Sequence, residues 1–210
     1  MPRTVDHGQR RADICDALVR AAARDGLHAV TMRSVAAEAG VSLRLVQYYF
    51  ENKGGLMHAA LLHLEERSHR RWNERLAALP SPAPARARVH AFVAEAIPDD
   101  EESRVFHLLW TSFAVLAMTD PALAEQPFVS GPERLERQLA DLLTEARADG
   151  GLPTDRDPAM EAPRLLALTH GLGTDVLTGR LTSDRALAVA EYHVDRVFDT
   201  RSTEGPPHIS

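Results

Sequence analysis

Residues 31–53, TMRSVAAEAGVSLRLVQYYFENK, decide the fold of this 210-residue chain. Thr31 and Ser42 are residue types that cap the N-termini of helices, and each precedes a short run with apolar residues at helical spacing. The three residues that join the two runs include a glycine, which permits a sharp change of direction. The pattern predicts two short helices, Met32–Ala39 and Leu43–Phe50, that meet as a helix-turn-helix.

Small apolar residues stand where the two helices must cross. On the first helix these are Val35, Ala36 and Ala39, and the second helix offers Leu45 or Val46 opposite them. These side chains can form the small core between the two helices, and the small residues Ala36 and Gly40 allow the close crossing that a three-residue connection demands. In a helix-turn-helix of this kind the second helix lies in the major groove of DNA.

The second helix carries polar side chains suited to that position. Arg44 and Gln47 are three residues apart and share one face; arginine pairs with guanine, and glutamine with adenine. The helix N-terminus favours a phosphate because its N–H groups are unpaired. Tyr48 and Tyr49 offer hydroxyls to the DNA backbone or rings to sugars and thymine methyls. Lys53, the only lysine in the chain, is placed to hold a phosphate.

The net charge of −6 is unevenly distributed. Residues 1–72 contain 11 Lys/Arg and 8 Asp/Glu, whereas residues 73–210 contain 13 and 22. DNA binding needs local positive charge and not a basic whole protein. The N-terminal excess favours DNA as a partner, although a difference of this size also arises by statistical scatter.

The rest of the chain is helical in pattern. Alanine and leucine far outnumber valine and isoleucine, which favours helices over strands. Apolar spacing and capping residues, including Asp157 and Ser183 as N-caps, predict an all-α fold of about nine helices and no strand. Besides the two short helices, the expected helices are Gln9–Asp25, Leu56–Leu79, Arg86–Ile97, Glu102–Met118, Pro132–Asp149, Pro158–Thr178 and a last one that ends near Asp199.

The proline-rich segment Pro80–Pro84 is the clearest hinge in the chain. It divides the expected organisation into four parts. These are a helix-turn-helix domain (1–53), a connecting helix (54–79), a ligand-binding and dimerisation domain (80–200) and a disordered polar tail (201–210).

Several function classes lack their sequence signals. The chain has no apolar stretch long enough for a membrane span and no secretory signal, and its one cysteine, Cys15, cannot form an internal disulfide. Gly171–Val176 starts like a dinucleotide fingerprint but lacks the third glycine and a preceding strand. No histidine pair has metal-ligand spacing, and no catalytic constellation is present. We therefore expect a cytoplasmic protein that is not an enzyme and has no metal, catalytic site or cofactor.

Residues 9–57 resemble the DNA-binding domain of the tetracycline-repressor (TetR) family of bacterial transcription regulators. The resemblance rests on Ala39-Gly40-Val41-Ser42, Tyr48-Tyr49-Phe50 and Asn52-Lys53. It implies base contacts by Arg33, Leu43, Arg44 and Gln47, and phosphate contacts by Thr31, Ser42, Tyr48, Tyr49 and Lys53. Arg44 and Leu45 stand where the family often has glycine and threonine, and Gln47 replaces a frequent tyrosine. The operator sequence therefore cannot be transferred from a relative.

In that family the C-terminal part binds a small molecule. The stretch WTSFAVLAMTDPALA, residues 110–124, is similar to the betaine-regulator-like branch. The candidate pocket residues are Phe106, His107, Trp110, Phe113, Met118, His170 and Thr174. Core packing is the alternative for each aromatic residue. A tryptophan and two phenylalanines are also suited to caging a quaternary ammonium group by cation–π contact.

The resemblance also implies a homodimer built from two C-terminal helices of each protomer. The candidate interface residues are Leu135, Leu139, Leu142, Leu165, Leu168, Leu172 and Val176. We expect a homodimeric repressor that binds double-stranded DNA at a pseudo-palindromic operator and is released by a small-molecule effector. The alternatives are an activator or architectural DNA-binding protein without a ligand, and an all-helical enzyme.

Overall fold

The computed structural model describes residues 6–118 and 130–199. Within those residues the chain forms nine α-helices, one 3-10 helix and no strand, which confirms the all-α prediction. The helices are α1 (His7–Asp25), α2 (Met32–Glu38), α3 (Leu43–Phe50), α4 (Lys53–Ala77), α5 (Ala85–Ala96), α6 (Glu101–Ala117), α8 (Ser130–Ala148), α9 (Pro158–Leu177) and α10 (Ser183–Phe198), and the 3-10 helix is Leu27–Ala29. The tail 201–210 and the second half of the stretch 110–124 lie outside the described residues.

Two predicted helix starts were wrong because a neighbouring side chain makes the cap. Helix α4 begins at Lys53 and not at Leu56, since the Asn52 side chain accepts a hydrogen bond from Gly55 N at 2.9 Å. Helix α10 is capped by Thr182, whose hydroxyl oxygen accepts from Arg185 N at 3.2 Å. The Ser183 hydroxyl instead donates to the Pro98 carbonyl oxygen at 2.7 Å.

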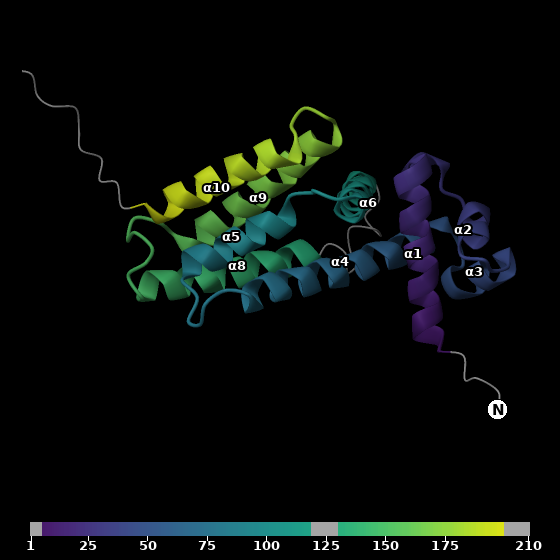
Figure 1. Ribbon diagram of the computed structural model, residues 1–210, viewed down its shortest axis with the longest axis horizontal. Coiled ribbons are helices and arrows are strands. Elements are labelled where there is room, and N and C mark those ends of the chain that lie inside the picture. Colours follow the sequence, from purple (N-terminus) through teal and green to yellow (C-terminus); the bar gives the residue numbers. More distant parts are fainter. Residues whose placement is uncertain (1–5, 119–129, 200–210) are drawn as a thin grey trace, which may run out of the picture.

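Helices α1, α2 and α3 form one end of the elongated molecule, which we call the head (Figure 1). Helix α4 runs from the head along a bundle that contains α5, α8, α9 and α10. Helix α6 lies between the head and the bundle, nearly perpendicular to α4, and packs against both α1 and α4. Two helices, α4 and α6, thus connect the head with the bundle.

The buried hydrophobic residues form two clusters, and the proline-rich segment Pro80–Pro84 is not the boundary between them in the sequence. The first cluster holds the apolar faces of α1, α2 and α3, the first half of α4 and three side chains of α6: Val105, Leu109 and Phe113. The second cluster fills the bundle and includes Trp72 from the far half of α4. Helix α6 follows residue 80 in the chain, yet it completes the core of the head.

The second cluster corrects the predicted dimer interface. Five of its buried side chains had been expected to face a partner: Leu139, Leu142, Leu165, Leu172 and Val176. They are at most 6% exposed because α8 and α9 turn their apolar faces toward α5, α10 and each other. Leu135 and Leu168 are partly exposed.

None of the helices in the described parts of the chain combines the length and the apolar character that a membrane span requires.

Candidate DNA-binding and ligand-binding sites

The turn between α2 and α3 is built by local hydrogen bonds. Thr31 and Ser34 form a capping box at the start of α2, with Ser34 N donating to Thr31 Oγ1 at 3.0 Å. Ser42 Oγ accepts from Leu45 N at 3.2 Å at the start of α3. Between them Gly40 has φ +64°, a conformation that favours glycine. These three features set the angle at which α3 leaves the turn.

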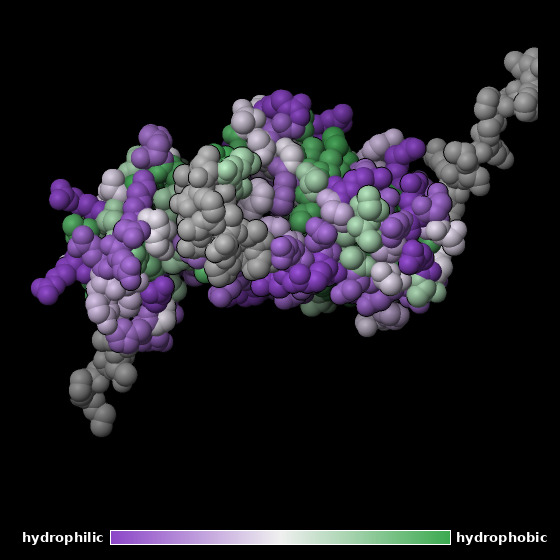
Figure 2. Space-filling model, turned by 180° about the vertical axis from the view of Figure 1, so that it is seen from behind, coloured by the Kyte–Doolittle hydropathy of each residue, from purple (hydrophilic) through white to green (hydrophobic). Residues whose placement is uncertain are grey.

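Helix α3 has one buried and one exposed face. Val46, and not Leu45, is the fully buried contact of this helix with α2, and Phe50 is buried as well. Arg44, Gln47 and Tyr48 point to solvent, and Tyr48 is 71% exposed. Hydrophilic side chains project from this end of the molecule (Figure 2). The face predicted to read bases is free of contacts that would bury it.

The remaining candidates surround this face. Four of them are exposed to solvent: Thr31, Arg33, Ser42 and Lys53. Leu43 and Tyr49 are half-buried. Six of the nine candidates thus belong to α3 or its N-cap, Lys53 begins α4, and Thr31 and Arg33 stand at the start of α2.

Two residues of α1 that the sequence analysis missed hold the end of α3. His7 Nδ1 lies 2.8 Å from the Tyr49 hydroxyl, and Arg11 donates to the Tyr49 carbonyl oxygen at 2.8 Å. The Arg11 guanidinium also stacks over the Phe50 ring, 4.8 Å from its centroid. No local sequence signal connects residues about forty positions apart, so these anchors emerge only from the packing of α1 against α3.

A cavity of about 850 Å³, including its opening to solvent, lies between α4, α5, α6, α8 and α9. Four predicted pocket residues line it: Phe106, His107, Trp110 and His170. The Trp110 and His170 rings stack with centroids 4.3 Å apart, so α6 and α9 together form one wall.

Three predicted pocket residues do not line this cavity. Phe113 is buried in the first cluster, on the face of α6 that points to the head. Met118 is 80% exposed just beyond the end of α6. Thr174 is exposed on α9, where its hydroxyl donates to the His170 carbonyl oxygen at 3.0 Å. Sequence spacing placed Phe113 and Thr174 within helices but did not tell which face of each helix meets the cavity.

Much of the pocket wall comes from residues that the sequence analysis did not assign to it. The unassigned aromatic and polar lining residues are Glu65, Ser68, His69, Trp72, Phe92, Glu95 and Thr169. Trp72 and Phe92 pack edge to face at 5.7 Å. Leu135, expected at a dimer interface, also lines the cavity. The helical spacing of Trp72 marked it as an apolar contact of α4, but it did not show that a cavity lies beside it.

Burial lowers the pKa of all three histidines that line the pocket, His69, His107 and His170, and so favours their neutral forms. Burial lowers the pKa of His107 to about 4, and its Nε2–H donates to the Ala96 carbonyl oxygen at 2.9 Å. The charged lining residues are therefore two carboxylates: Glu65, which pairs with Arg134 at 2.5 Å, and Glu95.

Comparison with known proteins finds family profiles that match both parts of the chain. The profile of bacterial regulatory proteins of the tetR family matches residues 14–60. The profile of the C-terminal part of BetI-type transcriptional repressors matches residues 84–199, more than half of the chain. The regulator BetI of Burkholderia lata is 32% identical over 93% of this chain and 97% of its own. PksA of Bacillus subtilis is 26% identical over 97% of this chain and 98% of its own.

Solved structures show the same fold. A TetR-family regulator from Rhodococcus sp. has a TM-score of 0.75 and 26% identity, and the match covers 91% of this chain and all of the other. A regulator from Saccharomonospora viridis, crystallised with choline, has a TM-score of 0.76 and 24% identity over 90% of this chain and 95% of the other. With its helix-turn-helix and BetI-type C-terminal part, the chain belongs to the TetR family of transcriptional regulators, which gives it a DNA-binding role and not an enzymatic one.

Proposed function

We propose that this protein is a homodimeric repressor that leaves its operator when a small cationic ligand enters the cavity. One observation carries the proposal: α6 contributes Phe106, His107 and Trp110 to the cavity, and two of these, Phe106 and Trp110, also pack against the core of the head, in which Val105 and Leu109 of the same helix are buried. A ligand that shifts α6 must therefore disturb the packing of the head. An activator or architectural protein without a ligand would need no such cavity.

The exposed face of α3 supports the proposed DNA contacts. Arg33, Leu43, Arg44 and Gln47 are proposed to contact bases. Thr31, Ser42, Tyr48, Tyr49 and Lys53 are proposed to contact phosphates and sugars. The accessible N-terminus of α3 offers further donors to the DNA backbone.

The division between base and phosphate contacts predicts two different mutant phenotypes. Gln47→Ala should weaken binding to the preferred duplex by about 1–3 kcal/mol and relax its sequence preference. Lys53→Ala should weaken binding to all duplexes similarly and reduce the dependence on salt, because one phosphate contact is lost. Anisotropy titrations with specific and scrambled duplexes at several salt concentrations measure both. Identical behaviour of the two variants would contradict the assignment.

We place the dimer interface on the outer faces of α9 and α10. Helix α9 exposes a stripe at helical spacing: Met160, Arg164, Ala167, Gly171 and Thr174. Tyr192 of α10 is 62% exposed, and Arg164 donates to His193 Nε2 at 3.1 Å across the two helices. The small residues Ala167 and Gly171 let the backbone of a second copy approach closely, with the partly exposed Leu168 beside them. Leu135 is instead proposed as part of the pocket wall.

The composition of the pocket supports a ligand with a compact cation. Trp72, Phe92, Phe106 and Trp110 offer aromatic rings, and the charged lining residues are carboxylates. Among the described residues, no hydrogen-bond acceptor reaches Trp72 Nε1, which is buried. An acceptor oxygen on the ligand would satisfy this donor once the groups that cover Nε1 move aside. The choline bound by the Saccharomonospora viridis regulator has both groups, a quaternary ammonium and a hydroxyl, and we propose a ligand of that class.

Selection of bound sequences from random duplexes, followed by titration with choline chloride, tests the proposal. The selected duplexes should be inverted repeats with half-sites separated by whole helical turns, about 10 bp or a multiple. Choline should raise the dissociation constant for the selected duplex, and the duplex should raise that for choline by the same factor. Selected sites without symmetry would contradict the dimer. Equal choline affinity of free and DNA-bound protein would contradict release by this ligand.

A further inference from the structure

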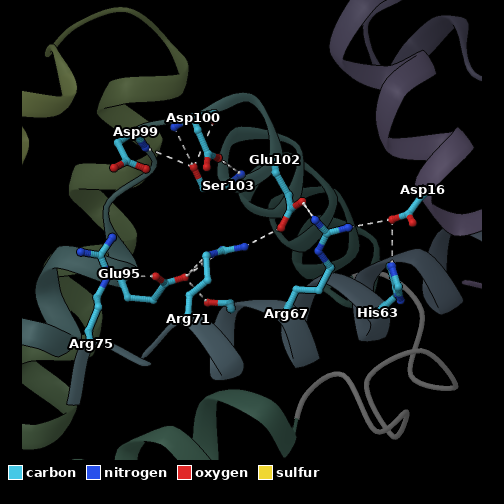
Figure 3. Close-up of polar contacts among 11 residues, drawn as sticks. Asp16, His63, Arg67, Arg71, Arg75, Glu95, Asp99, Asp100, Glu102 and Ser103 are labelled. Atoms are coloured by element: carbon cyan, nitrogen blue, oxygen red, sulfur yellow. Dashed lines mark hydrogen bonds and ion pairs between the residues drawn. The ribbon is translucent and has the colours of Figure 1, made fainter. Parts of the chain in front are cut away.

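A charged side chain of the head bonds to α4. Asp16 Oδ1 on α1 accepts hydrogen bonds from Arg67 Nη1 at 2.8 Å and from His63 Nε2 at 2.9 Å (Figure 3). Both partners lie on α4, one turn apart. The Asp16 side chain is 34% exposed, so water screens this contact only in part. The position of α1 is thereby tied to the side chains of α4.

Two arginines of α4 share one carboxylate of α6. Arg67 pairs with Glu102 Oε2, and Arg71 Nη1 pairs with Glu102 Oε1 at 2.5 Å. Glu102 lies in the first turn of α6, which is fixed by hydrogen bonds between its neighbours: Ser103 N donates to Asp100 Oδ1 at 2.7 Å. The carboxylate of Glu102 is therefore held in place by the start of its own helix.

Of these two arginines, Arg71 also reaches a wall of the cavity. Arg71 Nη2 lies 2.8 Å from Glu95 Oε1 on α5, and Arg75 Nε lies 3.3 Å from Glu95 Oε2. Ser68 Oγ also donates to Glu95, at 2.9 Å. Glu95 lines the cavity, and its side chain is only 7% exposed. A charge introduced beside it acts in a poorly solvated environment, where electrostatic interactions are strong.

The pairs form one continuous series, Glu95–Arg71–Glu102–Arg67–Asp16, from the cavity to the head (Figure 3). We propose that this ion-pair series transmits the occupancy of the cavity to the DNA-binding head. The proposal rests on the proposed function, because it assigns a route between the ligand and DNA sites. Each of the three inner residues, Arg71, Glu102 and Arg67, pairs with both of its neighbours in the series. A cation beside Glu95 weakens its hold on Arg71, Arg71 then binds Glu102 more strongly, and the sharing of Glu102 with Arg67 changes in turn.

A double-mutant cycle on DNA binding tests the series without a ligand. The variants are Glu95→Gln at the cavity end, Asp16→Asn at the head end and their combination, and the readout is the dissociation constant for the selected duplex. Glu95 and Asp16 share no bonding partner, since the partners of Asp16 are His63 and Arg67. We expect the fold-change in the dissociation constant of the double variant to differ by at least about threefold from the product of the two single-variant fold-changes.

The matched control uses an ion pair outside the series. Arg88 of α5 pairs with Glu145 of α8 at 2.8 Å on the surface of the bundle. Glu145→Gln and Asp16→Asn should give fold-changes that multiply within about twofold, as independent sites do. Arg67→Gln replaces Asp16→Asn as the head-end variant if the latter unfolds, which thermal denaturation reports for every variant.

The outcomes separate the two proposals. Fold-changes that multiply for Glu95→Gln with either head-end variant, in a protein that binds its duplex, overturn the ion-pair series and leave the repressor proposal intact. A wild-type protein that selects no duplex overturns the proposed function and the coupling with it. Non-multiplying fold-changes in the cycle, together with multiplying ones in the control, support the series.

Discussion

Gly55→Ala should unfold the head or weaken it by about 1–3 kcal/mol and should remove most of the affinity for DNA. A Cβ atom at residue 55 would lie 2.5 Å from the Phe50 carbonyl oxygen, a backbone atom that cannot rotate away. Phe50 ends α3, so relief of this overlap must change the angle between α3 and α4. Chemical denaturation and anisotropy titration with the selected duplex measure the two effects.

Gly54→Ala is the matched control for this substitution. Its Cβ atom would meet Asn52 Oδ1 at 3.2 Å, so the end of this side chain would have to shift by a few tenths of an ångström while it keeps its hydrogen bond from Gly55 N. Both glycines lie in the first turn of α4, so the change in helix propensity is the same. We expect Gly54→Ala to keep most of the stability and DNA affinity. Equal losses in the two variants would show that the contact with Phe50 is not what requires glycine.

Gly173→Ala should destabilise the bundle by about 1–3 kcal/mol and abolish the proposed response to choline. The new Cβ atom would lie 2.7 Å from two atoms of the His107 ring. That ring lines the cavity, and its hydrogen bond to the Ala96 carbonyl oxygen opposes movement. Gly173 is buried on α9, so the ring must move into the cavity or the helices must separate. Thermal denaturation with and without choline chloride measures stability and ligand binding together.

The double variant Gly173→Ala/His107→Ala shows whether the overlap is the cause. Removal of the imidazole makes room for the new methyl group, so the double variant should lose less stability than the sum of the two single losses. Additive losses would mean that Gly173→Ala acts elsewhere. At neutral pH this comparison involves no change of charge, because burial holds the pKa of His107 near 4.

The sequence by itself determined the parts of this protein that depend on neighbouring residues. The caps at Thr31 and Ser42, the turn at Gly40 and the spacing of Arg44 and Gln47 act within one or two helical turns. They predicted both short helices and the face of α3 that stays exposed. The same local signals placed most of the longer helices within a few residues of their ends.

Only the tertiary structure decided which apolar face meets which neighbour. Leu139 and Leu165 had the spacing expected of a dimer interface, yet both are fully buried in the core of the bundle within one chain. Phe113 and Trp110 lie on one helix, but only Trp110 lines the cavity, whereas Phe113 is buried in the core of the head. The series from Glu95 to Asp16 joins α1, α4, α5 and α6. Helical periodicity identifies the side of a helix that avoids water, whereas the partner that covers this side depends on how distant segments pack.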